Sequence, residues 1–291
     1  MDPCPHCLRP TFTARLGTDL DRGAALNLVA APGQGAGRLL EDLKRLPGRG
    51  PRLVANLKKH RASLAGLIAD LWRQTGLDGH PPTTLGGLSD RLVREAPGAA
   101  LLLHRFDALL DNPDLDPGYN DRFIDALNAL RNRGLALICV SAERLQPHVI
   151  LTPKGVRHGS TLDLTCEDMP ALGHGEIVAE VERRAPPLDG GGRALLAAAV
   201  LADPCPMDLL DLACRRLRNG QHRHLALNER LARWGGELKA ERGRIGPRSA
   251  VRVRHQVQTW WVASGVGKVL PVGRVAAWIC GLVPGCGKKR G

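Results

Sequence analysis

Short apolar runs alternate with amphipathic helical patterns through the first two-thirds of this chain. The apolar runs lie at residues 24–31, 52–57, 99–104, 135–141 and 160–165, and the helical patterns at residues 38–46, 62–75, 84–95, 119–132 and 173–184. This alternation is typical of a parallel sheet whose crossover helices cover both faces. We therefore expect an α/β fold.

A glycine-rich turn follows the first apolar run, where the chain passes from a strand into a helix. In such a turn the backbone N–H groups can surround phosphate, and the N-terminus of the next helix adds partial positive charge. The sequence thus predicts a phosphate-binding loop, with these candidate residues: Gly33, Gln34, Gly35, Ala36, Gly37 and Arg38.

Three segments, residues 24–43, 99–134 and 135–144, resemble P-loop ATPases of the AAA+/STAND kind. The resemblance is greatest to prokaryotic ATPases related to origin-recognition proteins, and it covers roughly residues 20–262. It implies a P-loop NTPase-like parallel sheet followed by a small α+β winged-helix domain. It also implies ATP as the ligand, with Ser141 at a strand end as the residue that senses the γ-phosphate.

The motifs depart from those of the family. Gly37 is followed by Arg38 and Leu39 in place of Lys and Ser/Thr, so Arg38 either replaces the lysine or the lysine is missing. His104 and Arg105 stand where the family has Asp-Glu. Phosphoryl transfer depends on positioned metal and charge, so we expect no catalytic residues, no metal site and no hydrolysis.

Two outcomes remain open for nucleotide: weak ATP binding without Mg²⁺, or complete loss of binding with the fold retained. Asp107 follows the altered strand end and is expected to be a solvated or capping residue rather than a displaced metal ligand. An active ATPase is the alternative that these departures argue against.

Charge divides the chain in two. Residues 1–190 hold 23 basic and 23 acidic residues, whereas residues 191–291 hold 18 and 6, which accounts for the whole net charge of +12. The pattern of the second part predicts three helices followed by a basic hairpin, whose first strand starts at residue 239. This is the arrangement of a winged-helix domain. We expect four parts: an N-terminal segment 1–18, an ATPase-like domain 19–190, a winged helix 191–262 and a tail 263–291.

The basic third of the chain predicts an anionic partner, with duplex DNA favoured. The candidate nucleic-acid contacts are Arg230, Arg233, Arg242, Arg244, Arg248, Arg252 and Arg254. Contact with a partner protein, or packing within the chain, is the alternative. A membrane surface is a third one, since residues 260–283 are apolar but carry Lys268 and Arg274, which disfavour spanning.

The N-terminus carries Cys4, His6 and Cys7 but is followed by no second Cys-x₂-Cys pair, so zinc is not expected. The eight cysteines are expected to be mostly buried thiols rather than a disulfide framework. The first residues contain no apolar stretch typical of a signal peptide, so we expect a cytoplasmic protein.

Overall fold

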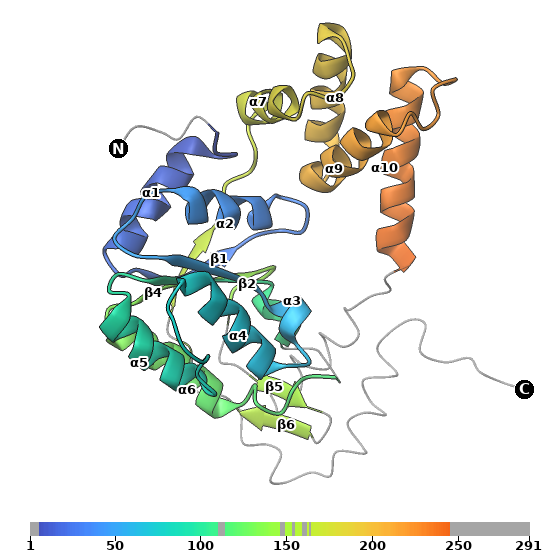
Figure 1. Ribbon diagram of the computed structural model, residues 1–291. Coiled ribbons are helices and arrows are strands. Elements are labelled where there is room, and N and C mark those ends of the chain that lie inside the picture. Colours follow the sequence, from blue (N-terminus) through green and yellow to red (C-terminus); the bar gives the residue numbers. More distant parts are fainter. Residues whose placement is uncertain are drawn as a thin grey trace, which may run out of the picture. The chain divides into compact units, whose positions relative to one another are not determined.

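A computed structural model describes residues 6–109, 114–145, 149–152, 155–158, 162 and 164–244 (Figure 1). The chain divides into two compact units, residues 1–242 and 243–291, and all but the last two described residues belong to the first. Its elements are α1 (Pro10–Asp21), β1 (Ala25–Val29), α2 (Ala36–Arg45), β2 (Arg52–Asn56), α3 (Leu57–His60), α4 (Leu64–Thr75), α5 (Leu85–Glu95), β3 (Ala100–His104), a 3₁₀ turn η1 (Phe106–Leu109), α6 (Asp121–Asn132), β4 (Ala136–Ser141), β5 (Val149–Thr152), β6 (Gly155–His158), β7 (Thr165–Asp168), α7 (His174–Arg184), α8 (Gly190–Ala202), α9 (Pro206–Arg218) and α10 (Leu227–Arg244).

Five strands form one parallel sheet in the order β2-β3-β4-β1-β7. Val29 at the end of β1 lies opposite Ser141 of β4 and Asp168 of β7. The carboxyl ends of parallel strands meet at one edge, and in open α/β sheets this is the edge where ligands bind. The predicted fold class, a P-loop NTPase-like parallel sheet with flanking helices, is confirmed.

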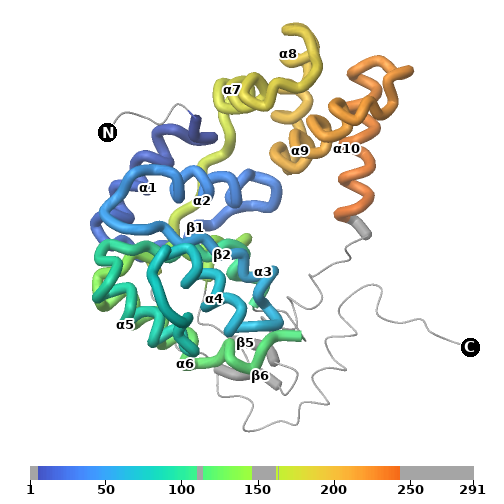
Figure 2. Tube along the Cα trace, viewed as in Figure 1, coloured from blue at the N-terminus to red at the C-terminus, as the bar shows by residue number. Residues whose placement is uncertain are grey.

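Successive side chains of each strand enter opposite layers of the core. Leu101 and Leu103 of β3 pack with α4, α5 and α6, whereas Ala100 and Leu102 pack with α1 and α2. Figure 1 shows these two groups of helices on opposite faces of the sheet, and Figure 2 traces α1 beside α2. The central strands β3, β4 and β1 are predominantly apolar because both of their faces are buried.

Helices α7 to α10 pack around their own apolar core. Trp234 of α10 is fully buried there, together with Ile177 of α7, Leu196 of α8 and Leu210 of α9. Because α7 (His174–Arg184) contributes to this core, the helical group begins before residue 191, where we expected the second domain to start.

Several elements differ from the sequence-based expectation. Residues 239–244 continue α10, so their prediction as a hairpin strand is wrong; Lys, Ala, Glu and Arg favour helix over strand. The fifth strand is β7, at the end of the predicted run, and α1 and the β5–β6 hairpin were not predicted. The remainder of the wing, the tail 263–291 and the apolar segment 260–283 lie outside the described residues.

None of the helices in the described part of the chain is long and apolar enough to cross a membrane.

A buried asparagine of β1 joins this strand to β4 and to the segment that follows β4. Asn27 of β1 is fully buried, and its Nδ2 donates to the carbonyl of Cys139 at 3.1 Å and to Oγ of Ser141 at 2.8 Å. Its Oδ1 accepts from the backbone N–H of Leu145 at 2.9 Å. The side chain therefore satisfies polar groups on β4 and on the segment that follows it.

We expect Asn27→Leu to destabilise the fold by about 2–4 kcal/mol, because each buried polar group left without a partner costs about 1–3 kcal/mol. Urea unfolding of the wild type and the variant measures this difference. Asn228→Leu, on an exposed position of α10, is the matched control and is expected to change stability by less than about 0.5 kcal/mol. Equal losses in both variants would contradict the bridging role of Asn27.

Candidate nucleotide site

The glycine-rich loop connects β1 to α2 at the ligand-binding edge of the sheet. Gly33 and Gly35 have φ of 76° and 82°, a left-handed conformation that glycine adopts without steric cost. Gly35 is the N-cap of α2, and no side chain caps this end of the helix. A phosphate cradle of the kind predicted from the sequence would require such uncapped N–H groups at the start of α2.

A cavity of about 300 Å³ lies beside the loop, at the lower end of the 300–1,000 Å³ common for ligand pockets. It is lined by the loop, the ends of β3 and β4, and the start of α9. Among its lining residues are the predicted Gly33, Gly35, Ala36, Gly37, Arg38 and Ser141. Other lining residues carry charge or a titratable ring: His104, Arg105, Asp107, Arg184, Asp208 and Asp211.

Residues from distant parts of the chain cover the two left-handed glycines. A Cβ on Gly33 would lie 2.2 Å from Cβ and 2.6 Å from Cα of Cys205. A Cβ on Gly35 would lie 2.9 Å from Cδ2 of Leu8 and from Cγ of Met207. Because Gly33 and Gly35 have no side chains, Cys205, Leu8 and Met207 can pack closely against the loop.

The residue that replaces the metal-binding carboxylate lies against the loop. A Cβ on Gly37 would be 3.3 Å from Cε1 of His104, at the end of β3. Burial, together with the positive charge of Arg105, lowers the pKa of His104 to about 4, against a weaker opposing effect of Asp107. His104 is thus neutral at physiological pH. Arg105 follows it with φ of 61°, a conformation uncommon for a residue with a side chain.

Arg38 points into an ion pair within the protein. Its Nε lies 2.8 Å from Oδ1 of Asp42, and one terminal nitrogen donates to the carbonyl of His6 at 2.8 Å. Asp42 also accepts the backbone N–H of Leu8 at 2.8 Å. Asp42 thus neutralises the one cation that could replace the family's lysine in the loop, and Arg38 tethers the N-terminal segment.

Ser141 is also engaged internally. It is 2% exposed, accepts a hydrogen bond from Nδ2 of Asn27, and donates to the carbonyl of Glu143 at 2.5 Å. Its single hydroxyl proton is therefore directed away from any phosphate in the cavity.

Sequence reasoning missed the contribution of the helical group to this cavity. Arg184 ends α7, pairs through Nε with Glu180 at 2.8 Å, and also contacts Asp211 of α9. Asp208 of α9 lies at the cavity too, paired with Arg242 at 3.2 Å. Nothing in the local sequence marks these positions, because the fold brings them to the loop from more than 140 residues away.

The described residues contain no cluster of three or more His, Cys, Asp or Glu side chains able to hold a metal ion. In particular, Asp107 lies on η1 and lines the cavity without a second carboxylate from β3. The sequence also predicts that Cys4, His6 and Cys7 do not bind zinc. Cys4 lies outside the described residues, so this stays a prediction.

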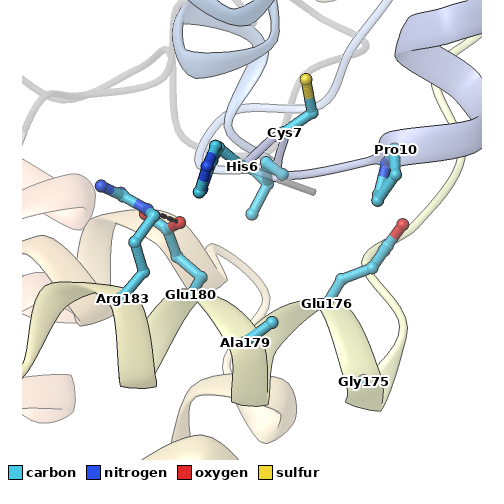
Figure 3. Close-up of a pocket in the computed structure, with 9 residues that line it drawn as sticks. His6, Cys7, Pro10, Gly175, Glu176, Ala179, Glu180 and Arg183 are labelled. Carbon is cyan, nitrogen blue, oxygen red and sulfur yellow. Dashed lines mark hydrogen bonds and ion pairs between the residues drawn. The ribbon is translucent and has the colours of Figure 1, made fainter. Parts of the chain in front are cut away.

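A second cavity, of about 210 Å³, separates the N-terminal segment from α7. Figure 3 shows His6 and Cys7 on one side and Glu176, Glu180 and Arg183 on the other, with Arg183 and Glu180 joined by an ion pair. Glu180 is 3% exposed and is bound by two arginines, so it offers the cavity no unpaired charge.

Three of the predicted nucleic-acid contacts have described side chains. Arg233 pairs with Glu237 at 3.2 Å, and Arg242 lies 3.4 Å from Asp203 besides its contact with Asp208. Arg230 is half-buried on α10. The side chain of Arg244, and the whole of Arg248, Arg252 and Arg254, lie outside the described part of the chain.

The sequence matches no protein-family model and no curated protein. Among solved structures, the chain is similar to Drosophila ORC bound to DNA, with 13% identity, a TM-score of 0.41, and 73% of this chain and 56% of that chain covered. It is also similar to C. elegans PCH-2, with 9% identity, a TM-score of 0.40, and 80% and 68% covered. The chain thus spans little more than half of the ORC chain, and we transfer no ligand or activity from either structure.

The shifted pKa of His104 predicts a pH-dependent stability. Between its folded pKa of about 4 and its unfolded value of 6.5, the unfolded chain binds more protons, so stability falls as the solution is acidified through this range. We expect the wild type to lose about 1–2 kcal/mol more than His104→Asn between pH 8 and pH 5.

Urea unfolding of both proteins at the two pH values checks this. The same pH dependence in the wild type and the variant would show that His104 is protonated in the folded state as readily as in the unfolded chain.

Proposed function

We propose that this protein is a P-loop ATPase-like protein that does not hydrolyse ATP and acts as a nucleic-acid-binding or scaffold component. The observation that carries the proposal is the composition of the sheet edge beside the loop. A neutral His104 and the cationic Arg105 occupy the positions that need carboxylates to hold Mg²⁺ and activate water.

The charges around the cavity support weak nucleotide binding at most. Three cationic side chains face three carboxylates there: Arg38, Arg105 and Arg184 against Asp107, Asp208 and Asp211. Such balance gives little attraction for a triphosphate, which family members bind with an unpaired lysine and a metal ion. The amides at the start of α2 remain as the donors that would bind phosphate, independently of Mg²⁺.

The nucleic-acid part of the proposal depends on the far end of the chain. Residues 245–291 contain eight basic and no acidic residues, whereas on α9 and α10 the side chains of Arg216, Arg233 and Arg242 are paired with acidic ones. Unpaired positive charge is what a polyanion recognises. A partner protein with an acidic surface is the alternative occupant of this end.

We expect no ATP turnover above about 0.1 s⁻¹, two orders of magnitude below the typical enzyme median of about 10 s⁻¹. Release of inorganic phosphate from ATP is measured with the full chain, with and without Mg²⁺ and duplex DNA. The His104→Asn variant is the control, because a trace activity that survives this change belongs to a contaminant or to another site. Mg²⁺-dependent turnover that is lost in His104→Asn would reject the proposal.

For nucleic acid, we expect the full chain to bind duplex DNA with a steep salt dependence. Replacing Arg252 and Arg254 with Ala should lower the slope of log K against log salt by about 1.8, since each lost phosphate contact contributes about 0.9.

Arg73→Ala with Arg94→Ala is the matched control, because it removes the same charge from exposed positions in the neutral part of the chain. An unchanged slope in the first double variant, or an equal change in the control, would place DNA binding elsewhere or rule it out.

A further inference from the structure

Helix α9 leads through residues 219–226 into α10, and arginines gather around this connection (Figure 1). Residues 212–236 contain six arginines and a single acidic residue, Glu229. Two of the six, Arg216 and Arg233, pair with Glu237. The other four make no ion pair within the described part of the chain, and we call them the basic patch: Arg215, Arg218, Arg223 and Arg230.

The patch consists largely of exposed side chains that the backbone holds in place. Arg215 and Arg218 are exposed and lie three residues apart at the end of α9, so their Cβ atoms are about 5–6 Å apart. A terminal nitrogen of Arg218 donates to the carbonyl of Arg184 at 2.9 Å. The exposed Arg223 folds over Gly220, where an added Cβ would lie 2.4 Å from its Nε. Guanidinium groups that are already ordered lose less entropy when they bind a ligand.

The surface around the patch is polar. Every leucine between residues 217 and 231 is buried or half-buried, and the carboxylate of Glu229 accepts the backbone N–H of Ala226 at 3.2 Å. The one aromatic residue of the region, Trp234, is fully buried, so unpaired bases find no stacking platform here. The exposed neighbours of the arginines carry amide or imidazole groups: Asn219, Gln221, His224 and Asn228.

We propose that the basic patch binds the phosphate backbone of duplex DNA. A planar guanidinium can donate two parallel hydrogen bonds to one phosphate, and exposed asparagine and glutamine side chains are further donors to phosphate oxygens. A surface without exposed large apolar side chains offers little to a lipid bilayer or to the apolar centre of a protein interface. The inference rests on the proposed function for the class of partner, and it adds contacts in the helical group to those expected from residues 245–291.

The proposal is tested in the full chain with Arg218→Ala combined with Arg223→Ala. Both side chains are exposed, so the fold is expected to persist. The slope of log K against log salt should fall by about 1.8, since each lost phosphate contact contributes about 0.9. Binding of labelled duplex DNA is followed by fluorescence anisotropy between about 50 and 200 mM salt.

Two controls separate lost charge from a disturbed connection between the helices. Arg218→Lys with Arg223→Lys keeps both charges but not the guanidinium groups, and it is expected to retain the slope of the wild type. Arg73→Ala with Arg94→Ala removes two exposed arginines elsewhere and is expected to leave the slope unchanged. Equal decreases in the alanine and lysine variants of the patch would mean that altered local structure causes the effect, and would overturn the proposal.

An unchanged slope in the alanine variant of the patch also overturns the proposal and would favour an acidic protein as the partner of this surface. Comparison with Arg252→Ala plus Arg254→Ala separates this failure from that of the proposed function. If that double variant lowers the slope and the alanine variant of the patch does not, only the patch is rejected. If the wild type does not bind DNA at low salt, the nucleic-acid function is rejected and this inference with it.

Discussion

The absence of a side chain at Gly33 is the constraint on which the observed site depends. It allows the backbone of Cys205 to approach so closely that a Cβ would lie 2.2 Å from the Cβ of that cysteine. This contact joins the parallel sheet to the helical group, and Arg9 and Leu8 reinforce it from the N-terminal side. The glycine-rich loop, whose geometry suits phosphate binding, therefore serves here as a packing contact between the sheet and the helical group.

The charged and titratable side chains around the glycine-rich loop mostly interact with other residues of the chain. Arg38 is neutralised by Asp42 and Arg184 by Glu180 and Asp211, while His104 stays neutral because its burial opposes protonation. Arg38 and Arg184 therefore have acidic partners within the chain. An ATPase needs the opposite arrangement, in which cationic groups and a metal ion are satisfied only when the nucleotide arrives.

The chain separates a charge-balanced structural part from a basic end. Residues 1–190 carry no net charge, and residues 245–291 carry eight basic residues without an acidic one. The paired arginines of α9 and α10 belong to the fold, so they add little to an outward positive field.

The sequence by itself determined the alternation of strands and helices, four of the five sheet strands and the glycine-rich turn, because these depend on local patterns of apolar residues and on glycine. It placed the fifth strand at residues 160–165, whereas β7 is Thr165–Asp168, a polar segment without an apolar run, and it missed the helical state of residues 239–244. Only the tertiary structure decided what covers the loop. Gly33 and Cys205 lie 172 positions apart, and a contact between backbones leaves no pattern in either local sequence.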